Sequence, residues 1–172
     1  MNLAYLSLGS NIEPERNLPL AVAHLARFGR VRAVSSVWES APAGLTEQPN
    51  FLNAAVLLET SLEAQVLREQ AIAQVEMALG RIRTENKNAP RTIDIDIMLF
   101  NHDVLQVGRR HIPDPEILER PFVAIPLAEI DPDYVHPETG QTLKQIAQPL
   151  QRGGITLRSE VILWSGVAPD TT

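Results

Sequence analysis

The chain has 172 residues, of which 44% are hydrophobic, so we expect one compact domain with a substantial core and no membrane span of about 18 or more apolar residues. Its formal net charge of -6 argues against a broad nucleic-acid-binding surface and leaves only a local anion site open. Because the chain contains no cysteine, disulfides and thiolate zinc sites are excluded, and without a signal-peptide pattern we expect a cytoplasmic protein.

The first third of the chain alternates strand and helix patterns. Residues 3–9 are predicted to form a buried strand that ends at a Gly-Ser-Asn turn. Pro14 suits the first turn of the helix that follows, whose apolar residues recur with the spacing of one helical face until Gly29. Residues 31–38 then indicate a second strand, and residues 39–50 a loop rich in Pro and Gly.

Residues 51–60 predict a third strand, and the next helix follows it directly. Thr60 and Glu63 have the spacing of a capping box, and Gly80 is a natural stop for this helix. Residues 81–91 are expected to form a loop, and residues 92–100 a fourth strand.

Strand, helix, strand, strand, helix, strand is the order of the ferredoxin-like fold, an α+β sandwich with the pattern βαββαβ. We expect two helices to cover one face of an antiparallel sheet, which leaves the other face or an edge for a ligand. After residue 104 the many prolines predict mostly irregular additions, with a helix at 143–150 and a strand at 155–164. The whole chain, 1–172, is expected to be one domain, with 155–172 as an extension of uncertain structure.

Asp94 and Asp96 lie two residues apart within the fourth predicted strand. Their side chains should share one face, with Cα atoms roughly 6.5 Å apart, while the intervening isoleucines face the other way. Two like charges on one face repel each other, so a cation is expected to neutralise them, and Mg²⁺ is the natural candidate. The alternative is an amphipathic strand whose polar face lies in water.

Four cations precede this pair within eleven residues: Arg81, Arg83, Lys87 and Arg91. A cationic loop beside carboxylates that hold a metal is what a polyphosphate site requires. The alternative for any single arginine is a solvated surface charge.

Residues 87–98 have the sequence Lys-Asn-Ala-Pro-Arg-Thr-Ile-Asp-Ile-Asp-Ile-Met. This segment resembles the signature of the 6-hydroxymethyl-7,8-dihydropterin pyrophosphokinase family, and residues 4–11, 48–56 and 79–83 resemble further blocks of that family. The resemblance covers roughly residues 3–145. It implies a ferredoxin-like fold and the transfer of pyrophosphate from ATP to a pterin alcohol, a step of folate biosynthesis. It also implies a monomer or weak dimer that acts without a prosthetic group.

Carried over by position, the resemblance implies that Asp94 and Asp96 bind two Mg²⁺ ions and act in catalysis with Arg81 and Arg91. The reaction would be an in-line attack on the β-phosphorus of ATP, with AMP as the leaving group, so catalysis is chiefly positioning and charge neutralisation. The residues implied to contact ATP are Glu76, Arg81, Arg83, Arg91, Ile97, Asp114 and Arg120.

The pterin is implied to lie between the rings of Phe51 and Phe122, since a flat heterocycle gains area burial and stacking there. Asn53 resembles the amide that reads the donor and acceptor edge of the pterin. The remaining residues of the implied pocket belong to one loop: Ser40, Ala41, Pro42 and Ala43. For either Phe alone, the alternative is ordinary packing in the core. For Glu76, the alternative is an exposed residue on a helix.

The chain departs from the family pattern at two positions. Asn88 stands where several members carry an aromatic residue, and Asp114 stands where they carry a histidine. Replacing a histidine donor by an acceptor would repel phosphates unless the carboxyl is protonated or bridged by metal. His111 is a possible substitute donor.

Two other functions stay open from the sequence. One is a nucleotide- or pterin-binding module that has lost catalysis, consistent with Asp114 and Asn88. The other is a two-metal nuclease or nucleotidyltransferase, which the acidic composition disfavours.

Overall fold

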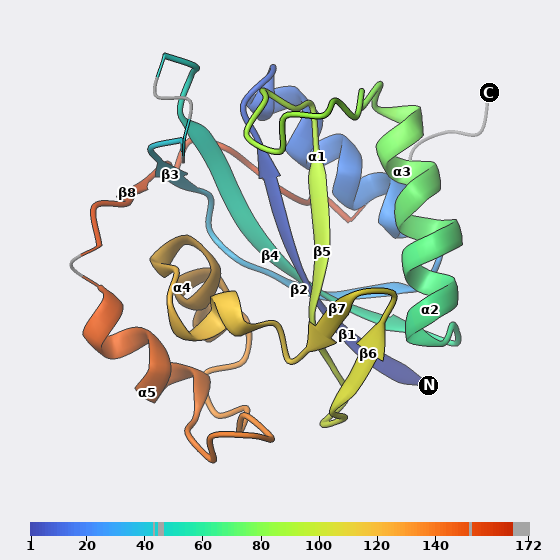
Figure 1. Ribbon diagram of the computed structural model, residues 1–172, viewed down its shortest axis with the longest axis vertical. Coiled ribbons are helices and arrows are strands. Elements are labelled where there is room, and N and C mark those ends of the chain that lie inside the picture. Colours follow the sequence, from blue (N-terminus) through green and yellow to red (C-terminus); the bar gives the residue numbers. More distant parts are fainter. Residues whose placement is uncertain (43, 45–46, 152, 167–172) are drawn as a thin grey trace.

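The computed structural model describes residues 1–42, 44, 47–151 and 153–166, and its centre is a six-stranded sheet (Figure 1). The strands of this sheet are β1 (Asn2–Ser10), β2 (Arg30–Val34), β3 (Trp38–Ser40), β4 (Phe51–Thr60), β5 (Asp94–Phe100) and β8 (Thr156–Leu157). Their order is β5-β1-β4-β3-β8, β2 also pairs with β4, and every pairing is antiparallel.

The remaining elements surround this sheet. They are α1 (Pro14–Leu25), α2 (Ala64–Val66), a π-helical turn η1 (Leu67–Ile72), α3 (Ala73–Ala78), the hairpin β6 (Leu105–Val107) and β7 (Arg110–Ile112), the 3-10 turns η2 (Pro115–Leu118) and η3 (Gln148–Leu150), α4 (Pro121–Ile130) and α5 (Leu143–Ala147). Within the described part of the chain, none of these helices is long and apolar enough to cross a membrane. The order of the long elements confirms the predicted ferredoxin-like topology.

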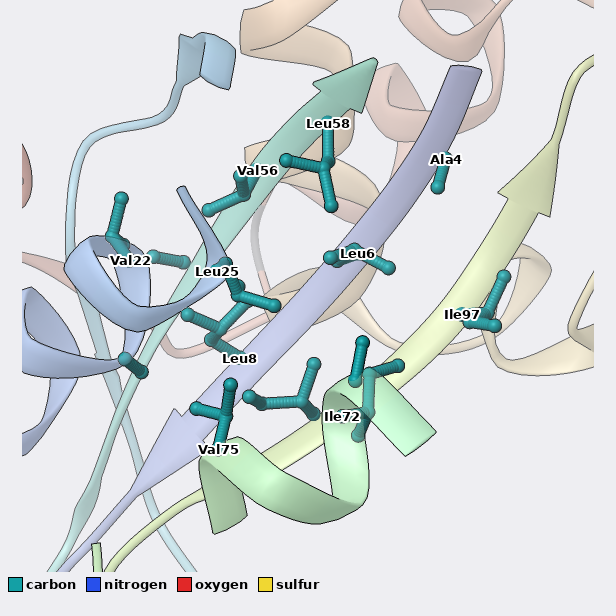
Figure 2. Packing of buried hydrophobic residues seen from close by; sticks show 14 of the residues in the cluster. Ala4, Leu6, Leu8, Val22, Leu25, Val56, Leu58, Ile72, Val75 and Ile97 are labelled. Carbon is teal, nitrogen blue, oxygen red and sulfur yellow. The ribbon is translucent and has the colours of Figure 1, made fainter. Parts of the chain in front are cut away.

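One face of the sheet is covered by α1 and by the continuous helix α2–η1–α3, as predicted. Leu6 and Leu8 of β1 point into this layer and pack with Val22 of α1 and Ile72 of η1 (Figure 2). Ile95 of β5 belongs to the same buried cluster. Because side chains alternate along a strand, Asp94 and Asp96 must face the opposite side.

The opposite face is also covered, which corrects the expectation that helices would lie on one face only. Helix α4 packs Val123 and Leu127 against Tyr5, Ala55 and Met98 of the sheet, and α5 lies beside it (Figure 1). The cluster covers only the part of this face nearest α4, so the acidic end of β5 stays open.

Helix α4 also corrects the prediction of a mostly irregular segment after residue 104. Its prolines misled the prediction in different ways. Pro121 stands at the start of the helix, where a missing N–H costs nothing, whereas Pro126 lies inside and leaves one helical hydrogen bond unmade. Burial of Val123, Ala124 and Leu127 offsets that loss. The hairpin β6–β7 was likewise not predicted.

The second predicted strand, residues 31–38, is two strands in the structure. Ser35 interrupts it, since its N–H donates to Ala55 O and its hydroxyl accepts from Ala55 N. β3 then begins at Trp38 and continues to Ser40, into the segment predicted to be a loop. The third strand matches its predicted bounds at residues 51 and 60.

The capping box predicted at Thr60 is wrong. The Thr60 hydroxyl donates to Phe28 O at 2.7 Å and accepts from Leu62 N at 3.2 Å, so it closes β4 instead of starting the helix. Glu63 is the N-cap of α2 and makes no side-chain capping bond. Gly80 ends the helix as predicted, with a positive φ of 75° that suits glycine.

The C-terminal predictions are confirmed in part. The helix predicted at 143–150 is present as α5 and η3. The strand predicted at 155–164 is wrong in extent, since only β8 pairs with the sheet and Leu163 then enters the main core at 4% exposure. Residues 167–172 lie outside the described residues.

Leu6 tests the inner layer, because it is fully buried in the central strand. We expect Leu6→Ala to lower the free energy of unfolding by about 2–5 kcal/mol through lost burial and a residual cavity. Met77→Ala, at a residue that is 78% exposed, is the control and should change it by less than about 0.5 kcal/mol. Urea unfolding measures both, and equal effects would contradict this packing.

Candidate active site

A cavity of about 830 Å³ opens at the uncovered end of the sheet face that carries α4. Strands β1, β3, β4 and β5 and residues 81–91 line it, together with the start of α4. Of the residues predicted from the sequence, the cavity brings ten together: Ser40, Ala41, Phe51, Asn53, Arg81, Arg83, Arg91, Asp94, Asp96 and Phe122.

The other predicted residues do not line this cavity. Ile97 points into the core, although it borders a second pocket of about 10 Å³ beside Asp96. Arg120 is exposed at the N-cap of α4, and Pro42 lies apart from the lining. Ala43 lies outside the described residues.

Glu76 lies behind the cavity wall and is only 4% exposed, so the exposed-helix alternative is wrong. Its carboxylate accepts from Arg83 at 2.7 Å and from the backbone N–H of Ile95 at 3.2 Å, and Arg81 lies 3.6 Å away. Glu76 therefore ties α3 to β5 and fixes the two arginines at the mouth of the cavity.

Asp94 is held by two guanidinium groups. Arg81 Nη1 donates to Oδ1 at 2.7 Å, and Arg91 Nη1 donates to Oδ2 at 3.1 Å. Burial would raise the pKa of this carboxyl, but the hydrogen bonds and charges of Arg81 and Arg91 hold the pKa below its usual value. Asp94 is thus a carboxylate with compensated charge.

Asp96 is in the opposite situation. Burial and the charge of Asp94 raise its pKa to about 7, against the opposing effect of Arg110, whose Nη1 lies 2.9 Å from Oδ1. One acidic side chain of the pair therefore lacks a full counter-charge, which a divalent cation would supply.

The donor set fits Mg²⁺ bound jointly with substrate. Among residues 1–42, 44, 47–151 and 153–166, no group of three or more His, Cys, Asp or Glu side chains could hold a metal by itself. Mg²⁺ is typically held by one or two carboxylates together with water and substrate phosphates. Asp94 and Asp96, on one face of β5 in a cavity rich in arginine, match that pattern.

At the other end of the cavity, β3 and β4 orient a polar amide. Asn53 Nδ2 donates to Trp38 O at 3.1 Å and to Ser40 Oγ at 2.8 Å, which fixes the orientation of the amide. A Cβ at Gly9 would lie 3.5 Å from Asn53 Oδ1 and 3.9 Å from the ring of Phe51. Gly9 therefore leaves the floor beside these two side chains flat.

The aromatic side chains are placed differently. Phe51 carries the guanidinium of Arg91 5.8 Å from its ring centroid, within cation–π distance. Phe122 is partly buried against the α4 cluster and also lines the cavity. The cavity thus has a cationic and acidic part and a part with rings and an amide, and the two parts meet where Arg91 lies over Phe51.

Three cavity arginines were not predicted from the sequence: Arg68 of η1 and Arg109 and Arg110 around the hairpin β6–β7. Arg110 is the most consequential, because it contacts both Asp96 and Asp114. The adjacent pair at 109 and 110 is the only sequence signal, and its placement depends on a hairpin that was not predicted.

The departures from the family pattern have structural counterparts. Asp114 is 6% exposed and does not line the cavity; its carboxylate accepts from Glu116 N at 2.9 Å and from Arg110 Nη1 at 3.2 Å. Asp114 thus caps η2 and pairs with the guanidinium of Arg110. His111 pairs with Glu138 at 2.8 Å, away from the cavity lining, and Asn88 lies in that lining.

Asp96 makes the stability of the metal-free protein depend on pH. Its pKa is raised from 3.8 to about 7 on folding, so this stability contribution is complete below about pH 4 and is lost as the pH rises to about 7. Asp96→Asn cannot titrate and should gain stability relative to wild type across that window.

Urea unfolding in a chelating buffer at a series of pH values measures this gain. Ser7 of β1 is the cross-strand partner of Asp96, and Ser7→Ala is the control. Its difference from wild type in the free energy of unfolding should not vary with pH. A constant difference for Asp96→Asn between pH 4 and pH 8 would show that the carboxyl titrates normally.

Comparison with known proteins identifies the family of this chain. Residues 5–132 match the family model described as 7,8-dihydro-6-hydroxymethylpterin-pyrophosphokinase (HPPK). The 2-amino-4-hydroxy-6-hydroxymethyldihydropteridine pyrophosphokinase of Bacillus subtilis is 45% identical over 132 residues, which cover 75% of this chain and 78% of that protein. The protein of the same name from Methylorubrum extorquens is 40% identical over 158 residues, which cover 90% and 98%.

A solved structure supports the fold independently. The crystal structure of Plasmodium falciparum HPPK-DHPS with pteroate has a TM-score of 0.67 over 86% of this chain, at 13% sequence identity. This chain spans 44% of that fused one, so the likeness concerns the fold of one part. With the family model covering most of its length and two relatives above 30% identity, the chain belongs to the 7,8-dihydro-6-hydroxymethylpterin-pyrophosphokinase family.

Proposed function

We propose that this chain transfers pyrophosphate from ATP to 6-hydroxymethyl-7,8-dihydropterin, giving AMP and the pterin diphosphate, a step of folate biosynthesis. The observation that carries the proposal is a single cavity with an acidic pair and arginines at one end and a fixed amide and two rings at the other. Such a cavity suits a reaction between a polyphosphate and a flat heterocycle.

The arginine end is proposed to receive the triphosphate. Arg81 and Arg91 already have fixed positions, since each is bonded both to Asp94 and to backbone carbonyls. Arg83 is paired with Glu76, but its side chain is 60% exposed, so a nucleotide can reach it from solvent. Guanidinium groups bind phosphate oxygens in pairs and neutralise their charge, so these residues orient the chain of phosphates for in-line attack.

The acidic pair is proposed to hold two Mg²⁺ ions. When bound, these ions would neutralise phosphate charge and stabilise the entering and departing oxygens. The role of the protein is to keep Asp94 and Asp96 on one face of β5, next to the arginines that are proposed to bind the phosphates. The pterin hydroxymethyl oxygen bonds to the β-phosphorus, the bond from that phosphorus to the AMP oxygen breaks, and the hydroxymethyl proton leaves to solvent.

The pterin is proposed to lie between Phe51 and Phe122, with its polar edge toward Asn53. The amide nitrogen of Asn53 is engaged by Trp38 and Ser40, so its oxygen is the group left to accept from the heterocycle. Ser40 and Ala41 line this end. We propose that Pro42 and Ala43 also serve the pterin, as the family resemblance implies.

Further parts of the proposal follow from the sequence. We propose that residues 1–172 act as one domain, as a monomer or weak dimer in the cytoplasm. Glu76 and Asp114 are proposed to serve the nucleotide indirectly, since each holds an arginine that lines the cavity. Arg120 and the backbone of Ile97 remain proposed nucleotide contacts.

Mg·ATP and the pterin substrate test the reaction directly. Wild-type protein should release AMP, and Asp94→Ala or Asp96→Ala should slow that release by about 100-fold or more, because the phosphate charge is no longer neutralised. Asp133→Ala, at an exposed aspartate, is the matched control and should keep the wild-type rate.

Tight binding of Mg·ATP by the wild type without AMP release would favour the binding module that has lost catalysis. Normal turnover by both aspartate variants would contradict the metal role.

Phe122 tests the pterin end. We expect Phe122→Ala to raise the KM for the pterin by about fivefold or more, since stacking of aromatic rings is worth about 1 kcal/mol, and to leave the KM for ATP nearly unchanged. Val104→Ala, at a residue that is 53% exposed, is the control. A rise in the KM for ATP of equal size would place Phe122 outside the pterin pocket.

A further inference from the structure

Strand β3 carries the pterin end of the cavity and is held by its pairing with β4 and by the bond from Trp38 Nε1 to Glu129 of α4. It has three residues, and its partners on β4 are those of the proposed pocket: Trp38 pairs with Asn53, and Ser40 pairs with Phe51. A strand this short is marginal without a neighbour on its second edge. Whatever fixes β3 therefore fixes the amide of Asn53.

Strand β8, from the C-terminal part of the chain, pairs with the second edge of β3. Trp38 pairs with Leu157 and Glu39 with Thr156, and Arg158 N donates to Val37 O at 2.8 Å. We call residues 156–164 the C-terminal strap. It lies beyond the residues matched by the family model, which end at 132.

Arg158 fastens the strap with its side chain as well. Its guanidinium lies 3.0 Å from Glu39 of β3 and 3.5 Å from Glu15 of α1, and it also bonds Glu160 within the strap. Because side chains alternate along a strand, Glu39 faces away from Ser40, whose hydroxyl bonds Asn53 on the cavity side. Arg158 thus grips β3 from behind the pocket.

The strap has a fixed far end. Leu163 is 4% exposed and belongs to the main core, against which Val161 and Trp164 also pack. One end of the strap is buried in the core and the other end is hydrogen-bonded to β3. The strap therefore fixes the position of β3 as well as covering its edge.

We propose that Arg158 is a positioning residue for the pterin: through Glu39 it holds β3 in the register that presents the Ser40 hydroxyl and the Trp38 carbonyl to Asn53. This inference rests on the proposed function. The path runs from Arg158 to β3 and then to the amide that faces the ligand, and it touches neither Asp94 nor Asp96.

The test is Arg158→Gln, which keeps the backbone hydrogen bond to Val37 and removes the charge. We expect the KM for the pterin to rise about two- to fivefold, the range that a partly exposed ion-pair network supports, with kcat and the KM for Mg·ATP unchanged. Arg158→Lys should recover part of the loss, and Glu39→Gln should reproduce it without adding to it in the double variant.

Arg32→Gln is the matched control, because Arg32 forms a similar pair with Glu59 on the sheet and does not line the cavity. It should leave both KM values at wild-type levels. An unchanged KM for the pterin in Arg158→Gln, or an equal rise in both KM values, would overturn the inference. If the wild type itself makes no AMP, the proposed function fails instead, so the two failures are distinguishable.

Discussion

The alternation of side chains along β5 is the constraint on which the site depends. Ile93, Ile95 and Ile97 must face the layer formed by α1 and α3, where each is almost completely buried. With that face fixed, Asp94 and Asp96 have only the other face to occupy. Helix α4 covers the rest of that face with apolar side chains but does not extend over the aspartates. The two carboxyl groups therefore face a cavity and not the core. The two faces of β5 therefore have different roles, because one packs in the core and the other carries the aspartates of the candidate site.

Two carboxylates in so confined a place need cations, and the protein supplies them unequally. Asp94 has Arg81 and Arg91, whereas Asp96 shares Arg110 with Asp114, and the pKa values of the two carboxyls move in opposite directions as a result. Asp96 is therefore the carboxyl whose negative charge is less well compensated. The same arginines that neutralise the pair carry the donors that phosphates require, so the groups that balance the charge of the free protein are also those proposed to bind a polyphosphate.

The sequence was informative where a pattern is local and uninformative where it depends on distant contacts. The period of two at Asp94 and Asp96 and the mostly apolar sequence of β4 were readable directly. Helix α4 was not, because its apolar residues surround the helix and Pro126 resembles a break. The roles of Glu76 and Arg110 were hidden for another reason, since each depends on a partner brought close only by folding: Ile95 N for the first and Asp96 for the second.

The two ends of the cavity are therefore held by different means. The proposed phosphate end is built on β5, an edge strand of seven residues that pairs with β1 and is tied to α3 by Glu76, and on the ion pairs of Asp94 with two arginines. The proposed pterin end is built on β3, a three-residue strand near the other side of the sheet, whose outer edge would be free to shift or to pair elsewhere if β8 did not cover it. The pairing of that edge with β8, and the burial of Leu163 in the core, limit the movement of β3. A ligand read by a single fixed amide requires that rigidity, because an amide that rotates loses the distinction between donor and acceptor.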